Sequence, residues 1–124
     1  MSKKVGYVYY ANSRRIDSSD NKERRRYVVV RDDGKNVGVS KIRGYNSNSK
    51  NIVRLYPLPE GKYPLSKKSG VDKKVYTRKA NSKTKLSLTD KSVFDDKHLF
   101  KLSSHDTHNV LVHTGRQGIK KKRT

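Results

Sequence analysis

The sequence contains no cysteine and no tryptophan, and Asp and Glu together supply only 11 of its 124 residues. A chain without cysteine forms no disulfide framework and offers no thiolate ligand to zinc. Apolar residues are also scarce, at 31% of the total, so the hydrophobic core has to be small. This length and this composition favour a single domain with few layers and long polar edges.

Long apolar runs are missing as well. The N-terminus, MSKKVGYVYY, has no apolar stretch of the length that a signal peptide needs, and no other segment is long enough to cross a bilayer. We therefore expect a cytoplasmic protein that has no membrane partner.

Positive charge, by contrast, is abundant, because 31 Lys and Arg residues give the chain a formal net charge of +20. So small and so basic a protein attracts polyanions. Nucleic acid is the favoured one, because Lys and Arg bind phosphates and release the counterions around them. An anionic membrane and an acidic protein are the alternatives, but no basic amphipathic helix is visible that would lie on a membrane.

Runs rich in Val and Tyr, separated by turn-forming residues, predict short β-strands. The run RRYVVVRD has a continuous apolar centre, which is typical of a strand buried on both faces. It is followed by DDGKN, a turn in which Gly34 supplies a positive φ, and then by a return strand. Strands are predicted over residues 4–11, 25–32, 37–43, 51–58, 73–79, 84–88 and 109–114.

Closely spaced short strands indicate a mainly β protein built as a small barrel with long polar loops. Residues 12–23 are predicted to form a flexible loop and residues 59–70 an irregular one. The stretch FDDKHLFKLSS predicts one short helix near 95–103, with a further strand as the alternative. Residues 1–115 are expected to form the domain, and residues 116–124 a disordered basic tail.

The order of elements resembles the start of the PemK/MazF-like toxins. The matching residues are GYVYYA, the polar loop through Glu23, and RRYVVVRDD, in which Tyr27 stands where the family usually has proline. The resemblance covers roughly residues 5–88. It implies a small SH3-like barrel whose long first loop borders an RNA site.

A second match lies in VYTRKANSKTKL, which resembles the family segment whose arginine and hydroxyl residue serve RNA cleavage. Arg78 matches the arginine, Lys79 replaces the hydroxyl residue, and Thr77 and Ser82 lie nearby. Metal-independent cleavage needs a base, an acid and a cation that stabilises the phosphorane. The resemblance implies an endoribonuclease without cofactor, an acidic antitoxin as partner, and a homodimer.

Histidines and paired carboxylates are the remaining candidates for acid–base or metal chemistry. His105 and His108 are three positions apart, so on a strand they would face opposite sides. The carboxylate pairs fall at predicted turns, where Asp caps backbone N–H groups. We therefore predict no metal site and no cofactor. These candidates are His98, His105, His108, His113, Asp32, Asp33, Asp95 and Asp96.

Eight of the ten aromatic residues are Tyr, interleaved with Lys and Arg. Surfaces that bind single-stranded nucleic acid use this combination, because bases stack on the rings while cations hold the phosphates. Tyr45 and Tyr63, in predicted loops, are the stacking candidates. The predicted nucleic-acid-binding residues are Arg14, Arg15, Arg24, Arg25, Arg26, Lys79, Tyr45 and Tyr63; the predicted catalytic residues are Thr77, Arg78 and Ser82.

Two classes of function remain open from the sequence. The first is a basic RNA-binding protein of the PemK/MazF-like toxin–antitoxin type, with endoribonuclease activity. The second is a non-enzymatic binder of nucleic acid or of a nucleoprotein complex. An anti-CRISPR protein that acts as a mobile-element inhibitor and a ribosome-associated factor are examples of that class. Both classes need a basic surface that faces nucleic acid or a nucleoprotein complex, and they differ in whether Arg78 performs chemistry.

Overall fold

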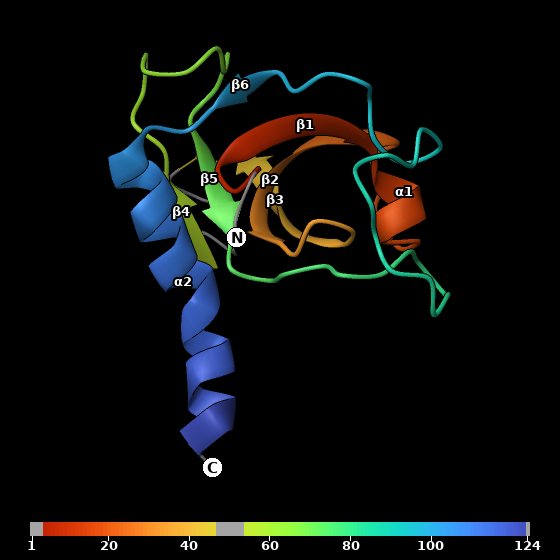
Figure 1. Cartoon of the computed structure of the whole chain (residues 1–124). Coiled ribbons are helices and arrows are strands. Elements are labelled where there is room, and N and C mark those ends of the chain that lie inside the picture. Colours follow the sequence, from red (N-terminus) through yellow and green to blue (C-terminus); the bar gives the residue numbers. More distant parts are fainter. Residues whose placement is uncertain (1–3, 47–53, 124) are drawn as a thin grey trace.

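Six antiparallel strands form one curled sheet in the computed structural model, which describes residues 4–46 and 54–123, with side chains through Gly115 (Figure 1). The strand order is β4-β5-β3-β2-β1-β6, and the sheet bends into a half-barrel. The prediction of a small, mainly β barrel is confirmed. The elements are β1 (Tyr7–Asn12), α1 (Ser13–Ile16), β2 (Arg24–Asp32), β3 (Val37–Gly44), β4 (Leu55–Pro57), β5 (Ser69–Asp72), β6 (Phe100–Lys101) and α2 (Ser104–Arg123).

The central strand β2 is buried on both faces. Val28 and Val29 are each at most 1% exposed, and they belong to different hydrophobic clusters. Successive side chains of a strand point to opposite faces, so the continuous valine run supplies both clusters at once. Gly34 has φ +96° in the turn to β3, which confirms the predicted glycine turn.

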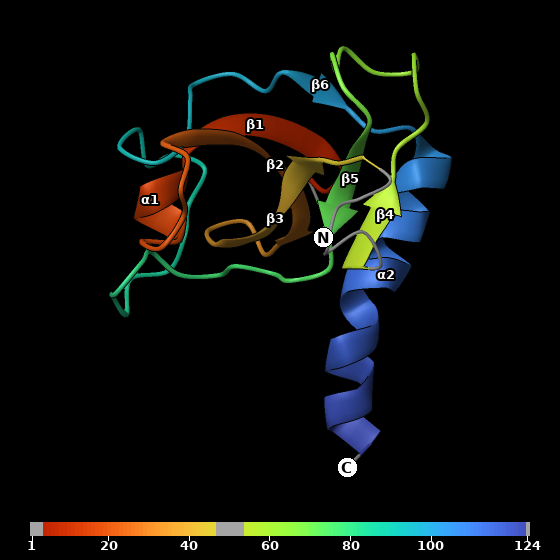
Figure 2. The ribbon, with the colours of Figure 1, turned by 180° about the vertical axis from the view of Figure 1, so that it is seen from behind.

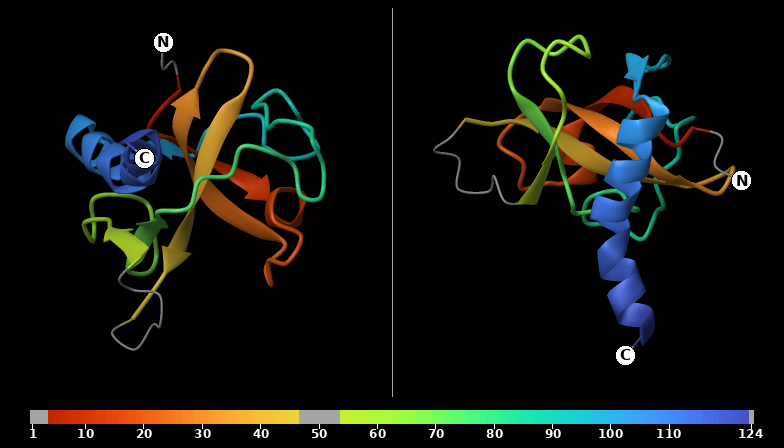
Figure 3. Two further views of the ribbon diagram at one scale, coloured as in Figure 1. Left: turned by 90° about the horizontal axis from the view of Figure 1, so that it is seen from below. Right: turned by 90° about the vertical axis from the view of Figure 1, so that its left-hand side faces the viewer.

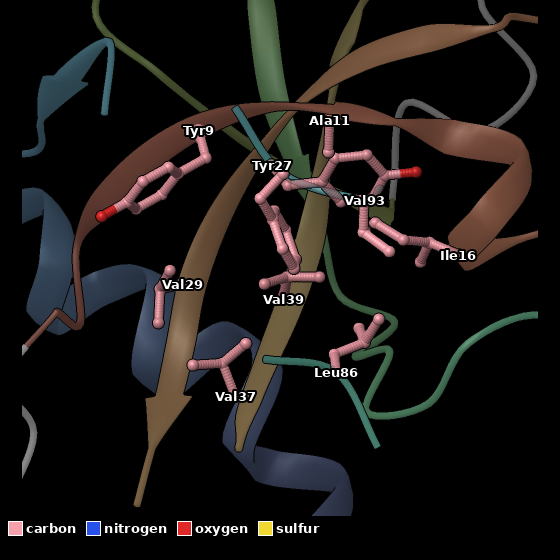
Figure 4. Packing of buried hydrophobic residues seen from close by; sticks show 10 residues of the cluster. Tyr9, Ala11, Ile16, Tyr27, Val29, Val37, Val39, Leu86 and Val93 are labelled. Atoms are coloured by element: carbon pink, nitrogen blue, oxygen red, sulfur yellow. The ribbon is translucent and has the colours of Figure 1, made fainter. Parts of the chain in front are cut away.

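The first cluster lies inside the curl of β1, β2 and β3 (Figure 4). Residues 73–99 wrap around the half-barrel (Figure 1) and close it through two isolated bridges, Val39 to Tyr76 and Ala11 to Phe94. Segments distant in sequence therefore complete this core. Its buried members are Tyr9, Ala11, Ile16, Tyr27, Val29, Val37, Val39, Leu86, Val93 and Phe94.

The second cluster packs the first half of α2 against the sheet. Val110, on α2, is 1% exposed and shares this cluster with Val8 and Val28. Figure 2 shows α2 running beside β4 and β5, and Figure 3 shows the rest of the helix projecting beyond the sheet. The projecting part includes residues 116–123, where the sequence predicted a disordered tail.

A buried carboxylate fixes the start of α2. Asp106 is 1% exposed and accepts hydrogen bonds from the Tyr63 hydroxyl and, at 3.0 Å, from the Tyr56 hydroxyl. Lys62 Nζ lies 3.0 Å from the same carboxylate. Burial raises the pKa of Asp106, but the bonds from Tyr63, Lys62 and Tyr56 outweigh it and leave the pKa below its ordinary value.

The predicted helix near 95–103 is wrong. The backbone N–H groups of this segment bond to β1 and to the residue before it. Leu99 N–H donates to the carbonyl of Val8, and Leu102 N–H donates to the carbonyl of Gly6. The alternative, a further strand, is confirmed at Phe100–Lys101, which forms β6, and helix α2 begins only at Ser104.

The predicted strand over 109–114 is also wrong, because these residues lie in α2. Val110 is buried, whereas Leu111 and Val112 are 36% and 40% exposed, so the apolar run buries only one helical face. Ser103 caps the helix: its Oγ accepts from Asp106 N–H and donates to the Asp106 carboxylate. This Ser-x-x-Asp pair is a variant of the capping box.

Four further predictions need correction. Strand β5 (Ser69–Asp72) begins in the last two residues of the predicted irregular segment 59–70. The predicted strands 73–79 and 84–88 contribute only isolated bridges. Gly70 permits β5 to approach β4, because a Cβ there would lie 2.8 Å from Leu55 Cβ. β4 is shorter than predicted, and residues 51–53 of that prediction lie outside the described residues.

The predicted flexible loop 12–23 is instead pinned by a buried ionic network. Lys41, on β3, is 2% exposed, and its Nζ lies 2.8 Å from Asp17 Oδ2 and 2.9 Å from Asp20 Oδ2. Arg25 holds Asp20 from the other side through Nε and Nη2, at 2.7 and 2.9 Å. The loop is therefore fastened to both β2 and β3.

Both carboxylates of this network have lowered pKa values. The hydrogen bond from Lys41 is the largest cause at Asp17. Burial raises the pKa of Asp20, but hydrogen bonds from Arg25 and Lys41 outweigh that effect. The Lys41 ammonium, in turn, has a raised pKa, because its two carboxylate partners outweigh its burial.

Replacing Lys41 by methionine should destabilise the fold by about 3 kcal/mol, because two carboxylates then lose a buried cation while Arg25 still pairs with Asp20. Urea unfolding measures the loss. The matched control is Lys22→Met, since the Lys22 side chain is exposed and outside the network. Equal stability of the two variants would show that the network contributes little.

Acid should unfold the protein through the same network. A carboxyl whose pKa is lowered by folding contributes stability above its unfolded pKa of about 3.9 and loses it as the pH falls. We expect the urea midpoint to decline between about pH 5 and pH 2.5, and to decline less steeply in Asp17→Asn. Glu60→Gln, which removes an exposed carboxylate elsewhere, should keep the wild-type slope. Identical slopes in all three proteins would contradict this assignment.

Candidate nucleic-acid interface

A hollow of about 600 Å³ opens beside the start of β2 and the end of β3. Parts of three stretches of chain border it in addition to β1: residues 21, 22 and 24–26, residues 42–46, and residues 65–67 and 69. Its lining includes six basic side chains and no Asp or Glu. The basic residues are Lys22, Arg24, Arg25, Arg26, Arg43 and Lys67, and Tyr10 and Tyr45 are the aromatic ones.

Arg24 and Arg26 share one face of β2, because they are two positions apart on a strand. Both guanidinium groups lie over the ring of Tyr10, with Cζ 4.6 Å (Arg24) and 5.9 Å (Arg26) from its centroid. Tyr10 is the β1 partner of Arg26 in the antiparallel register. Arg24 also forms an ion pair with Asp95, so Arg26 is the less constrained of the two.

Arg25 has a different role. It points away from its two neighbours, its side chain is 10% exposed, and its guanidinium forms the bidentate pair with Asp20. It thereby holds residues 21 and 22 against the hollow. We assign Arg25 to the scaffold of the hollow.

Arg43 stands on the wall formed by the end of β3. Its Nε lies 3.4 Å from Asp72 Oδ2, while Arg54 Nη2 lies 3.3 Å from Asp72 Oδ1. The Nε atom is buried, and the alignment with Asp72 is too poor for a hydrogen bond. Two guanidinium groups therefore share one carboxylate, which leaves this wall with excess positive charge.

Three cations of the hollow are without a carboxylate partner among the residues that the structure describes. Lys22, Arg26 and Lys67 form no ion pair with any residue in the part of the chain that the structure describes. Cations gathered in a recess, without carboxylates in its lining, produce a positive potential that concentrates anions. The described lining of the hollow therefore carries a net positive charge.

Of the two tyrosines predicted to stack on bases, the structure brings only Tyr45 to this hollow. Tyr63 lies near α2, where its ring stacks on Phe100 at 5.4 Å between centroids and its hydroxyl binds Asp106. One face of the Tyr63 ring is thus covered by Phe100, and its hydroxyl is bound to Asp106.

The other predicted binding residues lie outside the hollow. Arg14, on α1, donates from Nε to the carbonyl of Asp20 and lies 3.7 Å from Glu23. Arg15 is exposed on the same helix, and Lys79 forms an ion pair with Asp90. These three contribute to the general basic character of the surface.

The predicted catalytic residues lie on or beside one turn, away from the hollow. Arg78 Nη1 donates to the carbonyl of Lys83 at 2.6 Å, and Ser82 Oγ accepts from Thr84 N–H at 2.9 Å. Thr77 is half-buried, and its carbonyl accepts from Leu86 N–H. The Arg78 guanidinium and the Ser82 hydroxyl are therefore engaged with the backbone of their own turn.

The histidines near the C-terminus lie on α2. His105 Nε2 is 3.2 Å from Asn109 Nδ2, and His113 Nε2 is 2.8 Å from the carbonyl of Arg54. Within residues 4–46 and 54–123, no group of three or more His, Cys, Asp or Glu side chains is arranged to hold a metal ion.

Sequence reasoning identified Arg24, Arg26 and Tyr45 but missed other residues that line the hollow. Lys22, Arg43 and Lys67 come from three separate segments, which the pairing of β3 with β5 and the pinned loop bring together. Because Lys and Arg are common throughout the sequence, no local pattern distinguishes these three cations from the others. Tyr10 lies on β1, as the predicted first strand requires, and its side chain borders the hollow, which no local pattern indicates.

The fold and the hollow define a small, mainly β, strongly basic protein with a recessed cationic site. No known protein-family model matches the chain, and no curated protein matches it significantly. None of the described helices is both long and apolar enough to span a membrane. The similarity to the PemK/MazF-like toxins stays a prediction from the sequence.

Proposed function

We propose that this protein binds single-stranded RNA, with the phosphate backbone in the hollow beside β2. The observation that carries the proposal is the lining of the hollow, which combines six basic side chains with no carboxylate. Lys and Arg that neutralise phosphates release condensed counterions, and this release is the main source of affinity for a nucleic acid.

The form of the hollow favours a single strand. A recess of about 600 Å³ has the size of a small-molecule pocket, and a rigid duplex does not enter it. A flexible single strand places successive phosphates on the cations and a base against Tyr45, which borders the same recess. RNA is the proposed ligand because the resemblance over residues 5–88 is to proteins that act on RNA.

Binding is proposed as the primary function, since Arg78, Thr77 and Ser82 do not border the hollow. The endoribonuclease, with its acidic antitoxin and homodimer, remains the reading that the sequence resemblance supports. The experiment below separates the two, because it measures binding and cleavage in one sample.

Wild-type protein should bind a labelled RNA strand of about 12 nucleotides, with affinity that falls steeply between about 50 and 200 mM salt. Replacing both Arg26 and Lys67 by alanine should weaken binding about tenfold, and lower the slope of log K against log salt by about 1.4. The matched control, Lys35→Ala with Lys97→Ala, removes the same charge from exposed positions outside the hollow and should change affinity little.

Equal losses of RNA affinity in the two double variants would mean that binding depends only on the net charge of the protein. The hollow would then not be the binding site. The assay contains a metal chelator and is also analysed for strand cleavage. Cutting that disappears in Arg78→Ala would establish the endoribonuclease. Intact RNA at high protein concentration, with binding retained, supports the non-enzymatic binder.

A further inference from the structure

Two arginines and one aromatic ring form a compact unit at the edge of the hollow, which we call the arginine clamp: Arg24, Arg26 and Tyr10. The two guanidinium groups are supported by the same ring, at 4.6 and 5.9 Å from its centroid. A flat ring beneath a flat guanidinium restricts its orientation while leaving its N–H edge available. Two such edges on one face of β2 suit a phosphate, whose oxygens accept bidentate hydrogen bonds from arginine.

One carboxylate already occupies part of this clamp. Asp95 contacts Arg24 Nη2 through Oδ1, and the side chains are 48% and 41% exposed. The Asp95 backbone N–H donates to the carbonyl of Tyr10 at 3.0 Å, so the residue is held at the edge of β1 whatever its side chain does. Asp95 thus presents a planar anion to the arginine that a phosphate would use.

We propose that Asp95 is a built-in competitor for the phosphate of the RNA strand. In the free protein its carboxylate neutralises Arg24, and on binding a phosphodiester displaces it and is held by Arg24 and Arg26 together. Exchange is favourable because an ion pair between two exposed side chains is weak, whereas a phosphate held by two arginines gains charge-assisted bonds from both. This inference rests on the proposed function.

The neighbouring residue provides an unusually close control. Asp96 is also exposed, with 72% of its side chain accessible, and it forms an ion pair with Lys91 away from the clamp. Asp95→Asn and Asp96→Asn change the net charge by the same amount, one position apart. Only the first removes a carboxylate from Arg24.

Affinity for the labelled RNA strand should increase about threefold in Asp95→Asn, the gain expected when an exposed ion pair no longer competes, and should stay unchanged in Asp96→Asn. The gain should vanish when Arg24→Ala is combined with Asp95→Asn, because the competitor then has nothing to occupy. Arg24→Lys, which keeps the charge but loses the planar fork, should bind RNA more weakly than wild type. Thermal unfolding verifies that each variant is folded.

The possible outcomes are distinct. If wild-type protein does not bind RNA, the proposed function fails. If it binds, but Asp95→Asn and Asp96→Asn gain equally, the effect is one of net charge and only the competitor is overturned. Weaker binding in Asp95→Asn would overturn it too, because Asp95 would then orient Arg24 for the ligand. If Asp95→Asn increases the affinity for polyglutamate but not the affinity for RNA, the competitor proposal is overturned, and the ligand of Arg24 is then an acidic protein and not a phosphate.

Discussion

The buried contact between Lys41 and Asp20 is the interaction on which the rest of the molecule depends. In a chain with a net charge of +20 and a small core, each carboxylate has many cations with which it can pair. Eight of the 11 acidic residues form ion pairs within the described chain, so little negative charge remains for the surface around the hollow. Asp20 connects the largest number of elements, because it lies in the loop 12–23 and pairs with Arg25 on β2 and with Lys41 on β3. These contacts determine the position of Lys22, two residues further along the loop.

Scaffold and site are interleaved along a single strand. At the start of β2 the middle arginine pairs with a buried carboxylate, while the arginines on either side lie over the ring of Tyr10 at the edge of the hollow. Further along, the valines supply both hydrophobic clusters. The same alternation of a β-strand thus builds the core and presents the cations. Changes in this region have to be interpreted with stability and binding measured separately.

The sequence was informative where local chemistry decides the structure. The valine run and the glycine at position 34 predicted β2, its turn and β3 correctly, because both signals are local. The apolar run at 109–114 misled, since a capping pair at Ser103 and Asp106 commits it to a helix. Arg24, Arg26 and Tyr45 were found as candidates, whereas Arg43 and Lys67 depend on the pairing of β3 with β5, which no local pattern encodes.

Three identical residues in a row carry no information about which of them should point inward. A strand that slips by one position exchanges its two faces, and in the run from Arg24 to Arg26 such a slip would be chemically silent at the arginines themselves. Asp20 removes this degeneracy, because its buried carboxylate accepts hydrogen bonds from Nε and Nη2 of Arg25, the middle arginine, and from neither of the other two. The Asp20 carboxylate therefore fixes the register of β2, and with it the choice of Arg24 and Arg26 as the two arginines that lie over Tyr10.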